Sequence, residues 1–98
     1  MPFVYILECS DGSFYVGSTF DIDARLSQHN DGKGAKYTAR RRPVKLRWME
    51  EMDSIEEAYV LEKRVQGWSR AKRLALIEGR VSDLPRLSKR GYRPSQDG

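Results

Sequence analysis

Three segments of the chain have the residue pattern of β-strands. Residues 2–9 and 13–19 are rich in Val, Ile, Phe and Tyr, and Asp11-Gly12 lies between them, so we predict two strands joined by a tight turn. Residues 44–52 alternate apolar and charged side chains, as a half-buried strand does. The sequence therefore predicts a hairpin near the N-terminus and a third strand in the middle of the chain.

Helix signals occur after the second strand and again after the third. We predict a helix over residues 22–29 with Asp21 as its N-cap. A second helix is predicted from the Ser54 capping box to about Gly67, and a third over residues 69–79 with Ser69 as its N-cap. In the second helix, Ala58, Leu61 and Val65 recur at three- and four-residue steps, which is the spacing of one buried face.

The resulting order is strand, strand, helix, loop, strand, helix, helix, and it predicts one α+β domain over residues 1–80. Residues 81–98 are polar and contain proline, so we expect a flexible basic tail. A chain of 98 residues suits one domain. It has no apolar run long enough for a membrane span and no signal-peptide pattern at its start, which indicates a cytoplasmic protein.

Composition narrows the classes of partner and cofactor. One cysteine and one histidine exclude an internal disulfide and make a structural zinc site a poor fit. The net charge of +4 favours an anionic partner, and nucleic acid is the first candidate. The alternative is a domain whose surface is basic without binding such a partner.

The turn between the first two strands decides whether Tyr5 and Tyr15 share a face of the sheet, because a shift of one residue moves every side chain across it. A two-residue turn at Asp11-Gly12 places the tyrosines on opposite faces. A three-residue turn with Gly12 in the left-handed conformation pairs Tyr5 with Gly17, leaves open space beside the phenol and places both tyrosines on one face. Both turns suit the sequence.

The segments FVY (3–5) and YVG (15–17) resemble the GIY-YIG nuclease motif, with Phe3-Val4 in place of Gly-Ile. The resemblance covers about residues 3–78 and continues with Arg25, His29 and Glu62. Small stand-alone members of the family, which carry GKGAKYT and RRRP after the first helix, are the most similar.

This resemblance implies a three-stranded antiparallel sheet flanked by helices, with both tyrosines on one face. It implies a metal-dependent endonuclease that hydrolyses phosphodiester bonds in nucleic acid, DNA in preference to RNA, in repair or recombination. The implied cofactor is a single Mg²⁺ or Mn²⁺ ion. The implied catalytic residues are Tyr5, Tyr15, Arg25, His29 and Glu62, with Glu62 as the metal ligand.

Glu62 has a structural alternative to that role. It lies within about 60° of the apolar stripe of its helix, where a carboxylate is costly unless it is paired, metal-bound or able to reach water. A single carboxylate completed by waters and substrate phosphate is a common Mg²⁺ site. A residue at the edge of the stripe, paired with Lys63 or Arg64, would need no metal.

Arg25 and His29 lie one turn apart on one helix face. Arg25 would hold the scissile phosphate, and His29 would accept a proton or a hydrogen bond, unless both only border the solvent. Tyr5 would polarise or deprotonate the attacking water and Tyr15 would orient water or phosphate, whereas strand tyrosines also occur for packing alone.

The segment 31–43 contains glycines, five basic residues and a terminal proline, which predicts a loop. Its predicted nucleic-acid-binding residues are Lys36, Tyr37, Arg40, Arg41 and Arg42, which combine phosphate contacts with a ring for stacking. A solvated run of charges is the alternative.

Two features depart from the family pattern. Ser18 stands three residues after Tyr15, where some members have lysine, and residues 69–79 contain no asparagine. These departures favour an alternative function, a nucleic-acid-binding module with weak or no cleavage. A further alternative is an interaction domain that acts within a larger complex through a targeting protein. The sequence does not specify an oligomeric state.

Overall fold

The structure is a computed structural model that describes residues 1–80 and 82. The chain divides into two compact units, Met1–Gln66 and Gly67–Gly98. The elements of the first unit are β1 (Phe3–Glu8), β2 (Phe14–Thr19), α1 (Ile22–Asn30), α2 (Lys36–Ala39), β3 (Lys45–Glu51) and α3 (Ile55–Gln66). In the second unit, α4 (Arg70–Ile77) has Ser69 as its N-cap, and the Ser69 side chain accepts a hydrogen bond from the Lys72 backbone N–H. Apart from residue 82, the predicted tail lies outside the described residues.

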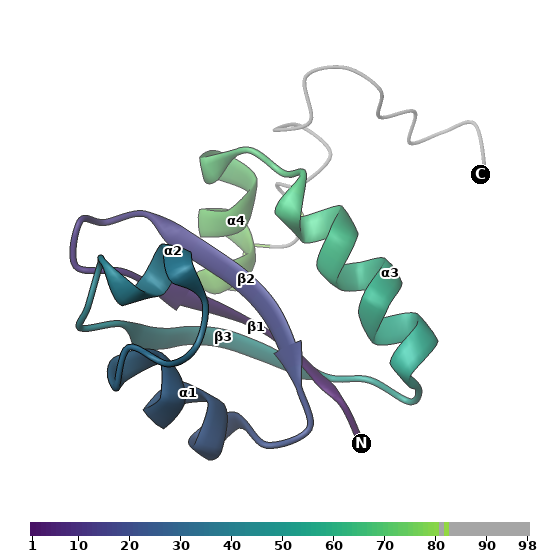
Figure 1. The fold of residues 1–98 in the computed structure, drawn as a ribbon. Helices are drawn as coiled ribbons and strands as arrows, with labels where there is room; N and C mark the ends of the chain where they lie inside the picture. The colour runs from purple at the N-terminus through teal and green to yellow at the C-terminus, as the bar shows by residue number, and fades with distance from the viewer. Residues whose placement is uncertain (81, 83–98) are drawn as a thin grey trace, which may run out of the picture. The chain divides into compact units, whose positions relative to one another are not determined.

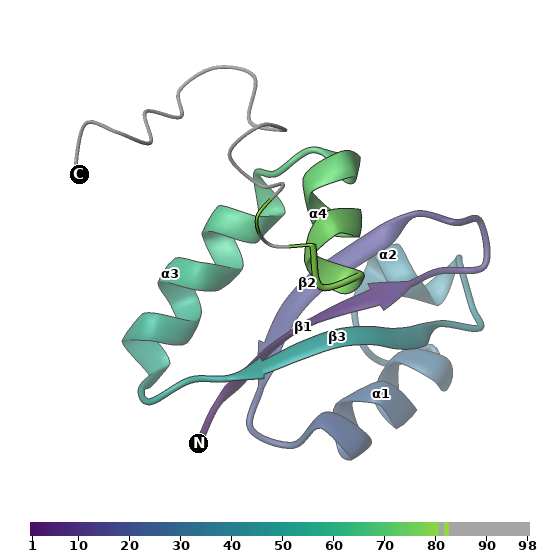
Figure 2. The same ribbon diagram turned by 180° about the vertical axis from the view of Figure 1, so that it is seen from behind.

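The three strands form one antiparallel sheet in the order β2-β1-β3, which confirms the predicted α+β fold. Figures 1 and 2 show α1 and α2 on one side of this sheet and α3 on the other. None of the helices in the described part of the chain has the length and apolar character needed to cross a membrane.

The hairpin between β1 and β2 has the three-residue turn. The Gly12 N–H donates to the Cys9 carbonyl at 2.9 Å, the Cys9 N–H donates to the Ser13 carbonyl at 2.8 Å, and Gly12 has φ of +85°. Tyr5 consequently pairs with Gly17. This register confirms the second of the two turns and places Tyr5 and Tyr15 on the same face.

Strand β1 is the centre of the core because it contributes buried side chains to both faces. Tyr5, Leu7 and Cys9 belong to one cluster with Val44, and partly buried side chains from α1 and the other strands pack against it. The alternate positions Val4 and Ile6 are fully buried on the opposite face. Helix α3 packs against β1 and β2.

Helix α1 is tied at both ends. The Asp21 carboxylate accepts from the Ala24 N–H at 3.1 Å, as an N-cap does. At the other end, the Asn30 side chain donates to the Val44 carbonyl at 3.1 Å and accepts from the Val44 N–H at 2.8 Å. The Asn30 amide therefore holds the end of α1 at the residue that precedes β3.

The prediction of a loop throughout residues 31–43 is wrong at its centre, where α2 occupies Lys36–Ala39. A four-residue helix spans about one turn and cannot show the repeated apolar spacing that reveals longer helices. Its N-cap position, Ala35, has no side-chain hydrogen bond, so the usual start signal is absent as well.

Candidate active site

Tyr5 lies in the centre of the sheet, and its ring covers Gly17. A Cβ atom built on Gly17 would lie 2.6 Å from the Tyr5 Oη atom and 2.8 Å from its Cζ atom. The space that the sequence predicts beside the phenol is therefore filled by the phenol itself, and Tyr5 is only 2% exposed. A side chain of any size at Gly17 would displace the ring.

His29 approaches Tyr5 from α1 and is completely buried. Its Nε2 atom lies 3.0 Å from the Tyr5 Oη atom, and its Nδ1 atom lies 2.7 Å from the Thr38 Oγ1 atom. The Tyr15 ring meets the imidazole edge-on, with ring centroids 5.2 Å apart. Burial, followed by the charge of Arg25, lowers the pKa of His29 below its ordinary value, so the imidazole is neutral at pH 7.

Arg25 lies beside Tyr5, one turn before His29 on α1. Burial raises the pKa of Tyr5, and the hydrogen bond and charge of the Arg25 guanidinium oppose this rise without cancelling it. The pKa of Tyr15 is also raised, by burial in the first place. Both phenols therefore keep their protons at neutral pH. The Arg25 Nη1 atom also donates to the Gln28 side chain at 2.9 Å.

Glu62 is half-buried on α3, and its two carboxylate oxygens accept different hydrogen bonds. Oε1 accepts from the Ser18 hydroxyl at 2.7 Å, and Oε2 accepts from the Gln66 amide at 2.9 Å. The Gln66 amide also donates to the Val16 carbonyl of strand β2, which forms one edge of the sheet. These contacts hold Glu62 against β2.

The hydrogen bonds of Glu62 go to Ser18 and Gln66 and not to the tyrosines. Ser18 pairs with Val4, so its side chain projects from the face opposite Tyr5. The negative charge of Glu62 still contributes to the raised pKa of both Tyr5 and Tyr15. Glu62 is thus an electrostatic neighbour of the phenols and is not hydrogen-bonded to them.

The chemistry of Glu62 suits a hard divalent cation. Each carboxylate oxygen has two lone pairs, so the bonds from Ser18 and Gln66 leave acceptor capacity on both atoms. Within residues 1–80 and 82, no cluster of three or more His, Cys, Asp or Glu side chains could enclose a metal. A cation at Glu62 would be completed by water and substrate phosphate, which is a common arrangement for Mg²⁺.

Only part of the predicted nucleic-acid-binding segment faces the tyrosines. The Tyr37 ring stacks on Tyr15 with centroids 6.1 Å apart and an interplanar angle of 25°. The Arg41 guanidinium lies 3.8 Å from the centroid of the Tyr37 ring and forms a 3.0 Å ion pair with Asp11. Tyr37 and Arg41 therefore extend the candidate site beyond Tyr15.

The other three basic residues among the predicted nucleic-acid contacts differ from Arg41. Arg42 donates to the backbone carbonyls of Ala39 and Asn30, at 2.9 and 3.4 Å, so its guanidinium helps to hold the segment against the end of α1. Lys36 and Arg40 are exposed. Of the predicted nucleic-acid contacts, they are the ones best placed to reach a separate molecule.

Sequence reasoning missed three residues of the site: Thr38 and Gly34 beside His29, and Gln66 beside Glu62. Thr38 is fully buried against His29, and a Cβ atom on Gly34 would lie 2.4 Å from the His29 Nδ1 atom. His29 itself could have indicated them, because a buried imidazole needs a hydrogen-bond partner for each ring nitrogen. The segment GKGAKYT directly after it supplies both the close backbone approach and the hydroxyl.

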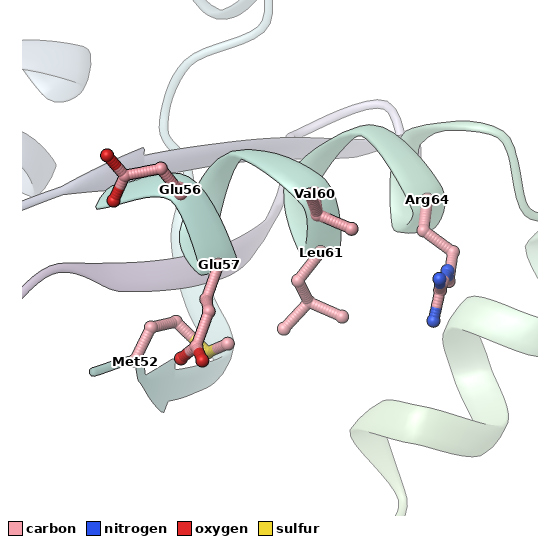
Figure 3. A pocket seen from close by; sticks show the side chains of 6 residues that line it. All are labelled: Met52, Glu56, Glu57, Val60, Leu61 and Arg64. Atoms are coloured by element: carbon pink, nitrogen blue, oxygen red, sulfur yellow. The ribbon is translucent and has the colours of Figure 1, made fainter. Parts of the chain in front are cut away.

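A separate groove of about 370 Å³ lies along α3, lined by Met52, Glu56, Glu57, Val60, Leu61 and Arg64 (Figure 3). At about 100° per residue, Glu62 and Arg64 project from nearly opposite flanks of α3. The groove therefore opens away from Glu62 and does not belong to the candidate site.

Comparison with known proteins agrees with the fold and the motif. Residues 1–75 match the family model described as the GIY-YIG catalytic domain. A UPF0213 protein of Halobacterium salinarum is 50% identical over 77 residues, which are 79% of this chain and 100% of the relative. A UPF0213 protein of Staphylococcus aureus is 47% identical over 78 residues, which are 80% of this chain and 95% of the relative.

The solution NMR structure of a UPF0213 protein from Bacillus halodurans has a TM-score of 0.52 and 47% identity to this chain. The match covers 80% of this chain and 84% of that one. The architecture of the sheet and its helices is therefore shared with a solved structure.

Proposed function

This chain belongs to the GIY-YIG family, a family of nucleases, and from that premise we propose that it is an endonuclease that hydrolyses phosphodiester bonds in nucleic acid. One observation carries the proposal, the buried 3.0 Å hydrogen bond between Tyr5 and His29 with the Arg25 guanidinium beside the phenol. A neutral imidazole, a phenol and a fixed cation are suited together to water activation and phosphate binding.

In the proposed reaction, Tyr5 acts as general base with His29 behind it. The attacking water gives a proton to the Tyr5 oxygen while the Tyr5 proton passes to the His29 Nε2 atom, so the phenol is neutral before and after the step. The raised pKa of Tyr5 makes a free phenolate costly, which favours this coupled transfer. The lowered pKa of His29 keeps the imidazole unprotonated and ready to accept.

Arg25 and Tyr15 complete the proposed arrangement around the phosphate. Arg25 supplies a permanent positive charge with a planar set of donors, which suits the scissile phosphate. Tyr15 keeps its phenolic proton at neutral pH and orients water or a phosphate oxygen. No covalent bond to a tyrosine is part of this reaction.

Glu62 would hold the single Mg²⁺ or Mn²⁺ ion that we propose as cofactor. The ion, when bound, would supply positive charge to the phosphate and lower the pKa of coordinated water. Ser18 and Gln66 would orient the Glu62 carboxylate through the 2.7 and 2.9 Å hydrogen bonds described above.

We further propose that the substrate is DNA in preference to RNA, in repair or recombination in the cytoplasm. Lys36 and Arg40 would contact the phosphate backbone, and Tyr37 and Arg41 would line the site beside Tyr15. Arg42 would support them by holding the segment against the end of α1. A protein partner could direct the domain to its substrate.

The test is metal-dependent nicking of labelled branched and single-stranded DNA and RNA by the full chain. We expect cleavage with Mg²⁺ or Mn²⁺, abolished by chelation and lowered at least about 100-fold by Tyr5→Phe, Arg25→Ala and Glu62→Ala. Glu56→Ala is the matched control, because Glu56 is an exposed carboxylate on the same helix. Equal residual cleavage by wild type and Glu62→Ala would overturn the proposal.

A nucleic-acid-binding module with weak or no cleavage is the second candidate. The hydroxyl of Ser18, which stands where some family members have lysine, donates to Glu62 and brings no positive charge to the site. If the wild type binds these substrates at moderate salt but does not cleave them with either metal, the binding module replaces the nuclease.

A further inference from the structure

We propose that Thr38 is a positioning residue that holds the His29 proton on Nδ1, so that Nε2 faces Tyr5 as an acceptor. The inference rests on the proposed function for its catalytic consequence. The position of the proton is itself a property of the folded chain, so it can be tested without any substrate.

Thr38 and His29 form an enclosed pair. Both are fully buried, and the Thr38 Oγ1 atom lies 2.7 Å from the His29 Nδ1 atom. A neutral imidazole has one N–H donor and one bare nitrogen, and the hydrogen bonds around the ring decide which nitrogen has the proton. Each ring nitrogen here has one polar neighbour, Thr38 on one side and Tyr5 on the other.

The environment of Thr38 sets the direction of the first hydrogen bond. Its hydroxyl lies 3.0 Å from the Ala35 carbonyl oxygen, which can only accept. Because the hydroxyl has a single hydrogen, donation to Ala35 leaves only a lone pair for His29. The short contact at Nδ1 is then an N–H donated by the imidazole.

The environment of Tyr5 is compatible with this direction. The Arg25 guanidinium can only donate, and it interacts with the Tyr5 oxygen. With the imidazole proton on Nδ1, Nε2 has no hydrogen, so the hydrogen of the phenol can point to Nε2 at 3.0 Å. The Ala35 carbonyl, a pure acceptor, thus orients the chain of hydrogen bonds that runs from Tyr5 through His29 and Thr38 to Ala35.

Gly34 holds the ring in the orientation that this chain requires. A Cβ atom on Gly34 would lie 2.4 Å from Nδ1 and 2.8 Å from both Cγ and Cε1 of His29, so the Gly34 backbone packs directly on the imidazole. Rotation of the ring by half a turn would place carbon atoms opposite Thr38 and Tyr5. The segment from Gly34 to Thr38 is therefore built around one orientation of His29.

Loss of the Thr38 hydroxyl should move the imidazole proton of His29 from Nδ1 to Nε2. In Thr38→Val the buried Nδ1–H has no acceptor, which is unfavourable, whereas a proton on Nε2 can still be donated to the Tyr5 oxygen. The imidazole would then give a hydrogen bond to Tyr5 and could no longer accept its proton. Thr38→Ser keeps the hydroxyl and should keep the proton on Nδ1.

The direct experiment is ¹⁵N NMR of the histidine ring in the full chain at about pH 8, above the ordinary histidine pKa of about 6.5. His29 is the single histidine of the sequence, so its ring signals need no assignment. We expect Nδ1 to be protonated in the wild type and in Thr38→Ser, and Nε2 to be protonated in Thr38→Val. A wild-type spectrum with the proton on Nε2 would overturn the inference.

The kinetic arm measures cleavage by the same proteins. We expect Thr38→Val to lower kcat at least about 100-fold with little change in KM. Thr38→Ser should keep most of the wild-type kcat. Thr19→Val, a change of the same kind away from the imidazole, is the control, and urea unfolding verifies that each variant is folded. Unchanged kcat in Thr38→Val would disprove the positioning role. Absence of cleavage in the wild type would disprove the proposed function and leave the NMR result to decide the proton's position.

Discussion

The contact between Tyr5 and Gly17 shows how a residue without a side chain can determine the place of a reactive group. The phenol occupies the volume that a Cβ atom at position 17 would need, at 2.6 Å from Oη. The glycine of YVG therefore lets Tyr5 lie flat against the neighbouring strand, with its oxygen directed to His29.

We predict that Gly17→Ala displaces Tyr5 from His29. Overpacking of this kind costs about 1–3 kcal/mol, measurable as a lower midpoint of urea unfolding, and the ring signals of His29 should change because Nε2 loses its partner. Gly12→Ala is the control. It is strained by its φ of +85°, but its Cβ would meet no atom within 4 Å, so it should destabilise the fold without altering His29. Identical histidine spectra for the two variants would refute the prediction.

Burial of neutral His29 predicts a pH dependence of stability. Its pKa is lower in the folded protein than in the unfolded chain, so the unfolded chain binds more protons between those two values. The free energy of unfolding should therefore decrease as the pH falls below about 6.5. Urea unfolding between pH 5 and pH 8 measures this slope, and His29→Gln should flatten it. A slope that persists in the variant would assign the effect to other groups.

At the scale of elements, α1 must be held firmly because it supplies both Arg25 and His29. The pair of hydrogen bonds from Asn30 to Val44 joins the end of this helix to the start of β3, between segments that are otherwise separated by the whole 31–43 segment. The Asn30 side chain thereby pairs with the Val44 backbone as a residue of a neighbouring strand would, through one donor and one acceptor.

We predict graded losses of stability at Asn30. Asn30→Ala removes both hydrogen bonds and should cost about 1–3 kcal/mol, because Val44 is buried and its backbone groups lose their partner. Asn30→Asp keeps the acceptor for the Val44 N–H and should lie between alanine and wild type. Chemical unfolding of the three proteins gives the order, and equal stability of the alanine variant and wild type would contradict it.

The elements differ in how far the sequence predicts them. The strands and the three longer helices follow from periodicity and cap residues such as Asp21 and Ser69, which work over a few neighbouring positions. The short helix α2 lacks both signals. In the candidate site, the identity of Tyr5, Arg25 and His29 follows from the motif, whereas the contact of Thr38 with His29 depends on how residues 31–43 fold back, which no local pattern encodes.

On the scale of the whole molecule, we expect residues 1–80 to form one domain, and the family match covers residues 1–75 of it. The relative from Halobacterium salinarum matches over its entire length of 77 residues. The net charge of +4 belongs to the full chain, and it makes binding to nucleic acid dependent on salt.

We predict that a chain ending at residue 80 folds with the stability of the full chain, to within about 0.5 kcal/mol by urea unfolding. The ring spectrum of His29 should also be unchanged, because the hydrogen-bond partners of the imidazole, Tyr5 and Thr38, lie before residue 40. The affinity for DNA can decrease, since residues 81–98 are basic. Loss of cooperative unfolding in the shortened chain would show that the domain extends beyond residue 80.

The central position of β1 also has a consequence for how the chain folds. Its pairing with β2 closes a turn of a few residues, whereas its pairing with β3 brings Tyr5 to Met49, across most of the first unit. The entropy lost on closing a loop increases with its length, so the hairpin is the less costly pairing to form. Tyr5 and Tyr15 can thus become neighbours early in folding, and the proton acceptor of Tyr5 joins them only when α1 and α2 pack on the sheet.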